Sequence, residues 1–284
     1  MVFGFTRYAG KLPLKAIGSM VVQSIITLTT DFGIEDIFSG VMKGVILSIS
    51  PECAIVDITH SIAPRDIESG ALALETACPY FPAGAIHVAV VDPGVGGDRR
   101  PIVVATDRGL FVGPDNGILT FAITGPCFRA AYELTQKKYF MAELSSTFHG
   151  RDIFAPAAAY LSQGVLPEKM GRLIADPVVL PAAEPVLRGD RLEGRILHSD
   201  RFGNLITNIK RHMLEGFVLD NRLHAECRGV AITRLLPFYG AARDEEYFCL
   251  IGSSGRLEIS LKNGSAAARL GADRGDVIFL KKIS

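Results

Sequence analysis

The chain has 284 residues, enough for two domains, and its 48% apolar and 21% charged residues are typical of a globular protein with a full core. Thirty acidic side chains balance thirty basic ones, which argues against nucleic acid or an anionic membrane as a partner and favours a small ligand. Five cysteines without a CxxC pair argue against a disulfide framework or a zinc site, so we expect a cytoplasmic protein without a metal or cofactor.

The first 19 residues differ in pattern from the rest of the chain. The apolar runs there are too short for a membrane span, and the segment fits a signal peptide poorly because Arg7, Lys11 and Lys15 interrupt its apolar region. We treat residues 1–19 as an N-terminal extension of unknown role and begin the first domain at Met20.

From residue 24 the chain alternates between strand and helix patterns. The expected elements are a strand over Ser24–Thr29, a helix over Glu35–Ile49, a strand over Ala54–Ile58, a helix from an N-cap at Asp66 to Cys78, and a strand over Ile86–Val91. This alternation implies parallel pairing with right-handed crossovers. A hairpin about residues 107–109 and an alanine-rich helix from Phe154 complete an α/β domain over residues 20–178, with a parallel-rich central sheet flanked by helices.

The composition changes after this domain. Pro177, Pro181 and Pro185 predict a linker over residues 179–190. Six short strands separated by turn residues come next: Glu193–His198, Leu205–Ile209, Val230–Thr233, Tyr247–Ile251, Leu257–Leu261 and Val277–Leu280. They predict a smaller all-β, barrel-like domain over residues 191–284.

The stretch from Val90 to Arg99 comes after the third expected strand and holds one proline, three glycines and three charged residues. Loops at the carboxyl edge of a parallel sheet are where ligands bind, and glycines let the backbone approach a ligand closely. Asp92 and Arg99 either form a surface ion pair across this turn or belong to a site.

Other loops at the same edge carry similar side chains. Asp31 either caps the next helix or binds a ligand, and His60, which comes shortly after Asp57, either satisfies a backbone group or belongs to the site. His149 precedes the alanine-rich helix, and Asp115-Asn116-Gly117 is interpreted as an ordinary turn. The signatures GxSxG, HExxH, GxGxxG and the Walker loop are absent from the sequence, so the common hydrolase, zincin, dinucleotide and NTPase motifs are excluded.

Asp92, Arg99 and His149 form the most specific combination. An acid, a guanidinium and an imidazole together can hold one water molecule and withdraw its proton. Arg99 would favour hydroxide electrostatically, while Asp92 or His149 accepts or relays the proton. Such chemistry requires no metal.

Seven stretches, in order and over nearly the whole chain, resemble one family. They are Thr29-Thr30-Asp31-Phe32-Gly33, Asp57-Ile58-Thr59-His60, Val91-Asp92-Pro93-Gly94-Val95-Gly96 with Arg99, Pro114-Asp115-Asn116-Gly117, the run from Thr147 to Pro156, Asp200-Arg201-Phe202-Gly203-Asn204 with Thr207-Asn208-Ile209, and Gly252-Ser253-Ser254-Gly255. The chain resembles the S-adenosylmethionine (SAM) hydrolases, or SAM hydroxide adenosyltransferases, which are related to the bacterial fluorinases.

The resemblance implies a homotrimer whose sites lie between one subunit's N-terminal domain and the next subunit's C-terminal domain. It implies attack of water on ribose C5′ of SAM, giving adenosine and methionine. The water-activating residues would be Asp92, Arg99 and His149. The substrate-binding residues would be Asp31 on the ribose diol, Asp200 on the methionine amine and Asn204 on the adenosine moiety, together with Phe32, Phe202, Ser253, Ser254 and Glu258.

Two alternatives stay open. The halogenating branch of this family departs at the water-activating positions and carries an extra loop, whereas this sequence keeps the Asp, Arg and His and shows no obvious insertion between Asp92 and His149. A halide transferase is therefore the second hypothesis. A non-catalytic module that binds SAM or adenosine is the third, and the three water-activating side chains argue against it.

Overall fold

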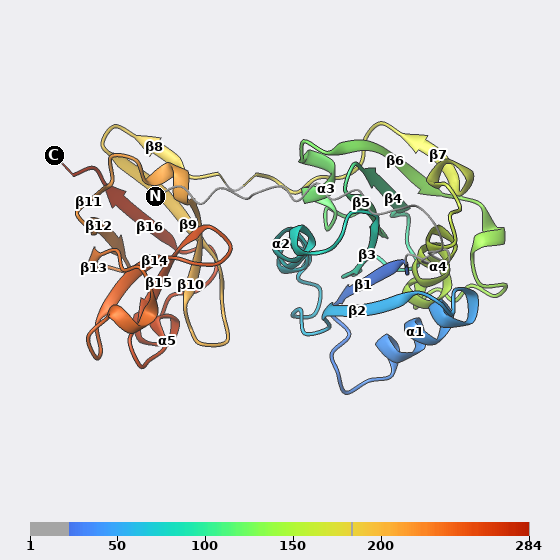
Figure 1. Ribbon diagram of the computed structural model, residues 1–284, viewed down its shortest axis with the longest axis horizontal. Helices are drawn as coiled ribbons and strands as arrows, with labels where there is room; N and C mark the ends of the chain where they lie inside the picture. Colours follow the sequence, from blue (N-terminus) through green and yellow to red (C-terminus); the bar gives the residue numbers. More distant parts are fainter. Residues whose placement is uncertain (1–22, 183, 284) are drawn as a thin grey trace, which may run out of the picture.

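The computed structural model describes residues 23–182 and 184–283, and Figure 1 shows two lobes joined by an extended connection. The predicted N-terminal extension, residues 1–19, lies outside the described residues. An α/β lobe is followed by a smaller all-β lobe, which confirms the predicted fold class. Among the residues described, no helix is long and apolar enough to cross a membrane.

The first lobe is built on a seven-stranded mixed sheet. Its strands are β1 (Ile25–Thr30), β2 (Ala54–Thr59), β3 (Ala85–Val90), β4 (Pro101–Thr106), β5 (Gly109–Pro114), β6 (Phe128–Leu134) and β7 (Gly171–Ile174). They lie in the order β2-β1-β3-β5-β4-β6-β7. The first four in this order are mutually parallel, β4 and β7 run antiparallel to them, and β6 runs in their direction, so five strands have their carboxyl ends at one edge.

Helices cover both faces of this sheet. They are α1 (Phe38–Ile49), α2 (Ile67–Ala77), α3 (Thr120–Thr124) and α4 (Ala155–Ser162). Helices α1 and α4 pack together on one face, where Met42 and Phe154 join the core, while α2 and α3 cover the other face through Leu74 and Ile118 nearby. Strand β3 is buried at every residue because it lies between the two layers, as expected for a central parallel strand.

The first helix begins later than the sequence pattern indicated. It starts at Phe38, not at Glu35, and Ile37, which the helical spacing placed on the apolar face, is 74% exposed. The segment from Asp31 to Ile37 is instead a loop at the end of β1. Its apolar side chains are exposed to water, which is energetically unfavourable and is typical of a binding surface.

The second lobe is an antiparallel, partly closed barrel. Its elements are β8 (Val186–Arg188), β9 (Arg191–Ser199), β10 (Leu205–Lys210), β11 (Val218–Leu219), β12 (Arg222–Cys227), β13 (Val230–Arg234), β14 (Tyr247–Ile251), β15 (Arg256–Leu261), α5 (Ala266–Leu270) and β16 (Val277–Lys281). The strand order is β11-β12-β16-β9-β10-β15-β14, with β13 on β12 and β8 on β9. A bridge between Leu235 and Cys249 draws β14 towards β13 and bends the sheet round its own core.

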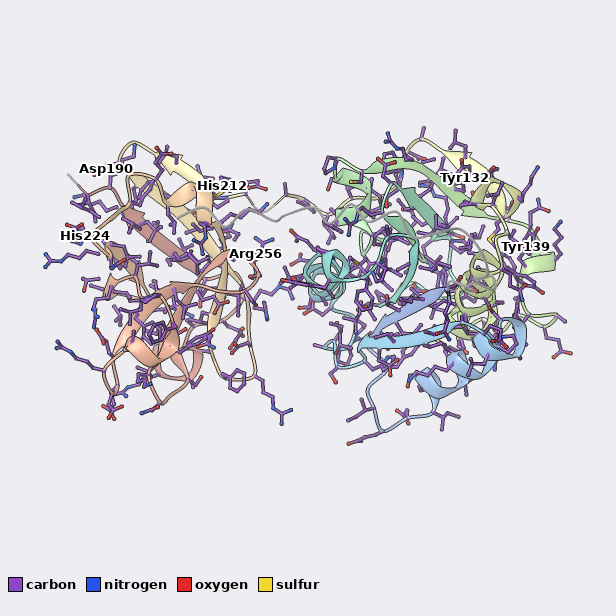
Figure 2. All side chains as sticks on the ribbon, in the orientation of Figure 1. Tyr132, Tyr139, Asp190, His212, His224 and Arg256 are labelled. Atoms are coloured by element: carbon purple, nitrogen blue, oxygen red, sulfur yellow. The ribbon has the colours of Figure 1, made fainter. Side chains whose placement is uncertain are left out.

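The connection between the lobes is attached at both ends. The N–H of Val178 donates to Asp115 at 2.7 Å, and β8, which lies within the predicted linker 179–190, pairs with β9. Two sets of ion pairs also join the lobes: Arg274 contacts Asp66 at 2.5 Å, and Arg256 contacts Glu75 at 2.9 Å. Figure 2 shows Arg256 on the side of its lobe that faces the first lobe.

Candidate active site

The carboxyl ends of β1, β2 and β3 bring three loops to one edge of the first sheet. Asp31 follows β1, His60 follows β2, and Asp92 comes two residues after the end of β3. Because the three strands are parallel neighbours, the residues that come after them start at the same edge.

Asp92, Arg99 and His149 are in direct contact. Arg99 Nε donates to both Asp92 carboxylate oxygens at 2.9 and 3.0 Å, and Nη2 donates to Oδ2 at 2.5 Å. The same Nη2 lies 2.7 Å from His149 Nδ1. The Asp92 and Arg99 side chains are 5% and 10% exposed, so this is a buried pair and not the surface ion pair that the sequence left open.

The chemistry of Arg99 decides the tautomer of His149. A guanidinium only donates hydrogen bonds, so Nδ1 must accept and the ring proton must be on Nε2. Burial and the positive charge of Arg99 lower the pKa of His149, against the opposite influence of Asp92, Asp152 and the Ser145 backbone. His149 is therefore neutral around pH 7 and carries no free acceptor nitrogen while Arg99 holds it.

Aromatic rings connect the His149 loop to the Asp31 loop. Phe148 packs edge-on against Phe32 and Phe38, with ring centroids 5.8 and 5.1 Å apart. Gly150 fits beneath them, since a Cβ there would lie 3.3 Å from Phe32. On the other side, the guanidinium of Arg99 lies over the Phe154 ring at 5.5 Å.

Asp31 lines an open cavity of about 620 Å³ with the residues that come after it and with the His60–Pro64 loop. Its Oδ2 accepts the N–H of Arg65 at 2.8 Å, while no partner among the described residues occupies Oδ1. Asp31 does not cap α1, whose N-cap is Ile37. One carboxylate oxygen thus faces outwards with lone pairs to spare.

His60 and Asp115 have structural partners. The buried His60 ring bonds Thr30 Oγ1 through Nδ1 at 2.8 Å, and Nε2 lies 3.1 Å from Asp57 Oδ1 without hydrogen-bond geometry. Asp115 binds Arg100 Nε at 2.8 Å and the connection between the lobes. Both residues fix loops at the sheet edge.

The C-terminal residues of the predicted site form a second group. Asp200 Oδ1 accepts the N–H of Phe202 and of Asn204 at 2.9 and 2.8 Å, and Oδ2 accepts Asn204 Nδ2 at 2.8 Å. Phe202 is 78% exposed, and Ser253 and Ser254 are exposed in the turn before β15. This group places a carboxylate and an exposed aromatic ring on one turn, with the Asn204 amide buried against the carboxylate.

Glu258 lies beneath that surface. It is 6% exposed and accepts the hydroxyl of Tyr239 at 2.8 Å. Burial raises the pKa of Glu258, and the negative charge of Asp200 adds to the rise. Tyr239 and its neighbour Phe238, which is 61% exposed, were not identified from the sequence, because no motif surrounds them.

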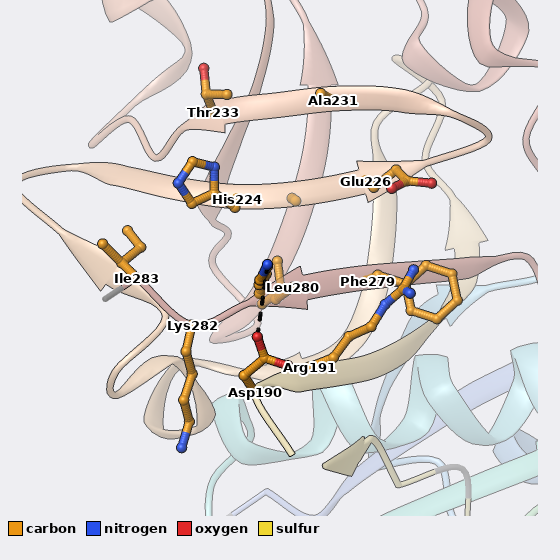
Figure 3. A pocket seen from close by; sticks show the side chains of 12 residues that line it. Asp190, Arg191, His224, Glu226, Ala231, Thr233, Phe279, Leu280, Lys282 and Ile283 are labelled. Atoms are coloured by element: carbon orange, nitrogen blue, oxygen red, sulfur yellow. Dashed lines mark ion pairs between the residues drawn. The ribbon is translucent and has the colours of Figure 1, made fainter. Parts of the chain in front are cut away.

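The chain does not bring the two groups into one cavity. The cavity at Asp31 is lined only by the first lobe. Two other cavities are present. One, of about 490 Å³, lies between α2 and His198 of β9 and shares the lining residues Ser61 and Ile62 with the cavity at Asp31. The other, of about 610 Å³, lies over β12, β16 and β9 on the outer face of the second lobe, where Figure 3 shows His224, Glu226 and Arg191.

No group of three or more histidine, cysteine or acidic side chains able to hold a metal ion occurs among the described residues. The five cysteines are all free thiols, and all but Cys127 are buried.

Comparison with known proteins gives a consistent result. Residues 26–171 match the model for the SAM hydroxide adenosyltransferase N-terminal domain, and residues 194–279 match the model for its C-terminal domain. A protein of Thermus thermophilus named (R)-S-adenosyl-L-methionine hydrolase is 40% identical over 253 residues, which cover 87% of this chain and 95% of that protein. An Actinoplanes fluorinase is 30% identical over 218 residues, 67% of this chain and 73% of the fluorinase.

A solved structure is also similar. The crystal structure of an uncharacterised conserved protein from Thermotoga maritima superimposes with a TM-score of 0.86 at 32% identity, and the match covers 90% of this chain and all of that one. The two domain models together span most of the chain. The chain therefore belongs to the SAM hydroxide adenosyltransferase family.

Proposed function

We propose that the protein hydrolyses S-adenosyl-L-methionine at ribose C5′, giving adenosine and L-methionine. The observation that carries the proposal is the buried contact of Asp92, Arg99 and His149 in a chain of this family. A polar group of this kind, away from solvent, holds a water molecule in a fixed place and draws charge from it.

We assign Asp92 as the residue that accepts the proton of the attacking water. His149 Nδ1 already accepts from Arg99, so the ring offers no acceptor to a water molecule. Each carboxylate oxygen of Asp92 has two lone pairs, and Arg99 does not use them all. Arg99 then stabilises the negative charge that develops on the water oxygen, and His149 holds Arg99 in place.

The reaction balances with these groups alone. The water oxygen forms a bond to C5′ as the bond from C5′ to sulfur breaks, the bonding electron pair goes to sulfur, and the water proton goes to Asp92. Methionine leaves as a neutral thioether, so charge disappears in the transition state and a site with little water favours the step. Alignment of oxygen, C5′ and sulfur is the other main contribution.

Residues that bind both ends of the substrate would supply that alignment. The free Oδ1 of Asp31 suits a ribose hydroxyl, and the Asp200 turn suits the methionine ammonium. Phe32 and Phe202 offer aromatic surfaces, while Asn204, Ser253, Ser254 and Glu258 offer polar atoms in the second lobe. Because the two groups lie in separate lobes, we propose that a homotrimer brings one subunit's Asp31 loop to the next subunit's Asp200 turn.

The direct test is to offer the purified protein the (R) and (S) sulfonium epimers of SAM separately and to chromatograph the products. We expect adenosine and methionine, with faster turnover of the (R) epimer that names the relatives. Asp92→Asn should lower kcat by about 10²- to 10⁴-fold, the usual effect of losing a general base. No adenosine from either epimer between pH 6 and pH 9 would refute the proposal.

The same assay separates the alternatives. A halide transferase would form 5′-halo-5′-deoxyadenosine when chloride or fluoride is supplied, and a binding module would retain SAM without consuming it. His149→Ala should reduce kcat less than Asp92→Asn does. Equal rates for Asp92→Asn and the unmodified protein would show that the assigned proton acceptor is wrong.

A further inference from the structure

Asp152 is a buried carboxylate that the proposed reaction does not use. It is 0% exposed, and its Oδ2 accepts both the N–H and the hydroxyl of Ser145, at 2.7 and 2.8 Å. Its Oδ1 accepts Arg151 Nε at 2.5 Å. Although burial opposes it, these hydrogen bonds hold the pKa of Asp152 below its ordinary value, so the buried group is charged.

Ser145 connects Asp152 to His149 through hydrogen bonds. Its hydroxyl accepts the N–H of Phe148 at 3.0 Å, one residue before His149, and its backbone hydrogen-bonds the His149 ring. Ser145 precedes His149 and Asp152 follows it, so the hydrogen bonds between these two residues hold together the two ends of the loop that carries the histidine. That loop leads directly into a π-helical turn, Gly150–Phe154, a feature frequent at functional sites.

The same loop abuts the Asp92–Arg99 turn. Gly96 has a φ of +78°, and a Cβ there would lie 2.1 Å from the Ser146 carbonyl oxygen. Only glycine fits at that contact. Asp152 therefore binds the segment Ser145-Ser146 at Ser145, and Gly96 packs against the same segment at the Ser146 carbonyl, so the loop that carries His149 and the turn that carries Arg99 are in contact there.

We infer that Asp152 is a positioning residue that, through Ser145, holds His149 Nδ1 against Arg99. The inference rests on the proposed function for its effect on catalysis, but the placement of the ring can be observed without any reaction. Asp152 touches none of the three residues assigned to water activation; it acts through His149.

A double-mutant cycle tests the catalytic part. Asp152→Asn keeps the size and one acceptor oxygen but loses the charge, and it should lower kcat about tenfold with little change in KM, since small misplacements of active-site groups cost up to about 10²-fold. In the His149→Ala background the same substitution should lower kcat by less than about twofold, because coupled residues are not additive. An equal fold decrease in kcat in the two backgrounds would refute the inference.

Arg151→Gln is the matched control. It removes the other partner of Asp152, is 37% exposed, and should leave kcat unchanged. Ser145→Ala removes the hydroxyl, and with it one of the two hydrogen bonds to Asp152 and the acceptor of the Phe148 N–H, but keeps the backbone; it should lower kcat, as Asp152→Asn does. This variant decides the question if Asp152→Asn does not fold.

Nitrogen-15 NMR of the histidine rings gives a readout independent of turnover. In the unmodified protein and in Arg151→Gln, His149 should be a single Nε2–H tautomer, as the Arg99 contact requires. In Asp152→Asn a second, Nδ1–H tautomer should appear. An unchanged His149 tautomer in Asp152→Asn would refute the inference even if SAM were hydrolysed, and a changed one would support it even if SAM were not the substrate.

Discussion

His87 lies in the middle of β3 and is 3% exposed. Its Nδ1 bonds Thr27 Oγ1 on β1 at 2.8 Å, and its ring stacks on Phe111 of β5 with centroids 4.9 Å apart. Burial lowers the pKa of His87 to about 4. The neutral ring is thus part of the sheet's core, and protonation opposes folding.

The pH dependence of stability is set in part by that shift. In the unfolded chain a histidine takes up a proton below about pH 6.5, whereas the folded chain resists it down to about pH 4. The unfolded state binds more protons in this window, so the free energy of unfolding should fall as the pH drops from 6.5 to 4, by roughly 3 kcal/mol from this residue. Urea denaturation at several pH values measures the slope.

His87→Gln is the control for this prediction. The amide keeps a partner for Thr27 but does not titrate, so the variant should be less stable at pH 7.5 and should lose less stability on acidification. Burial also lowers the pKa of His149 and His198, so part of the slope remains. An identical slope in the two proteins would contradict the assignment.

At the scale of single elements, some local signals were reliable and others were not. Asp66 was predicted to cap the second helix, and its carboxylate accepts the Ser69 N–H at 3.0 Å as α2 begins. Strands β6 and β7 were not predicted, because their hydrogen bonds go to β4 and to each other and their burial follows no clean alternation. Long-range pairing, not local pattern, determines such strands.

The candidate site, too, was predictable from the sequence only in part. Parallel order predicted that Asp31, His60 and Asp92 would reach one edge of the sheet, and they do. The sequence left open whether Asp92 and Arg99 form a surface pair, because their burial depends on the His149 loop. It also gave no sign that Asp152 supports that loop, since hydrogen bonds between loops have no periodicity.

The second lobe carries a row of basic side chains across four strands. Arg188 of β8, Arg191 of β9, Lys281 of β16 and His224 of β12 occupy directly opposed positions. Lys281 has a distant partner in Asp190, at 3.9 Å, and Arg191 lies over the Phe279 ring at 3.5 Å, on the face shown in Figure 3. Like charges directly opposite each other destabilise a sheet.

Arg188→Glu should therefore stabilise the protein. It places a carboxylate opposite Arg191, and Arg188 has no ion pair among the described residues to lose. The expected gain is about 0.2–1 kcal/mol at low salt, reduced at 1 M salt by screening. Arg188→Gln should gain less, because it only removes repulsion. Thermal denaturation of the three proteins at both salt concentrations measures this, and a loss of stability in Arg188→Glu would contradict the charge argument.

At the scale of the whole molecule, the proposed trimer makes a quantitative prediction. Light scattering after size exclusion should give three times the 30.6 kDa chain mass. If each site takes Asp92 from one subunit and Asp200 from the next, an Asp92→Asn chain and an Asp200→Asn chain are each inactive alone. Co-expressed in equal amounts, they should recover about a quarter of the normal activity, since random cyclic assembly makes one site in four intact.

The control for this experiment is a doubly substituted chain co-expressed with the unmodified one. In that mixture one site in four is again fully intact if sites lie between subunits, but one in two if each site lies within a chain. No recovery from the two single variants, in particles of the trimer mass, would place the whole site within one subunit.

The hydrogen bond between Arg99 and His149 joins residues 50 positions apart, and β4, β5 and β6 lie between them in the chain. Closing so long a loop costs entropy that only the completed sheet recovers, and contacts of this range form slowly. A chain still emerging from the ribosome, with the sheet unfinished, cannot assemble the water site. The protein therefore acquires the Arg99–His149 contact late in folding, when the first lobe is complete.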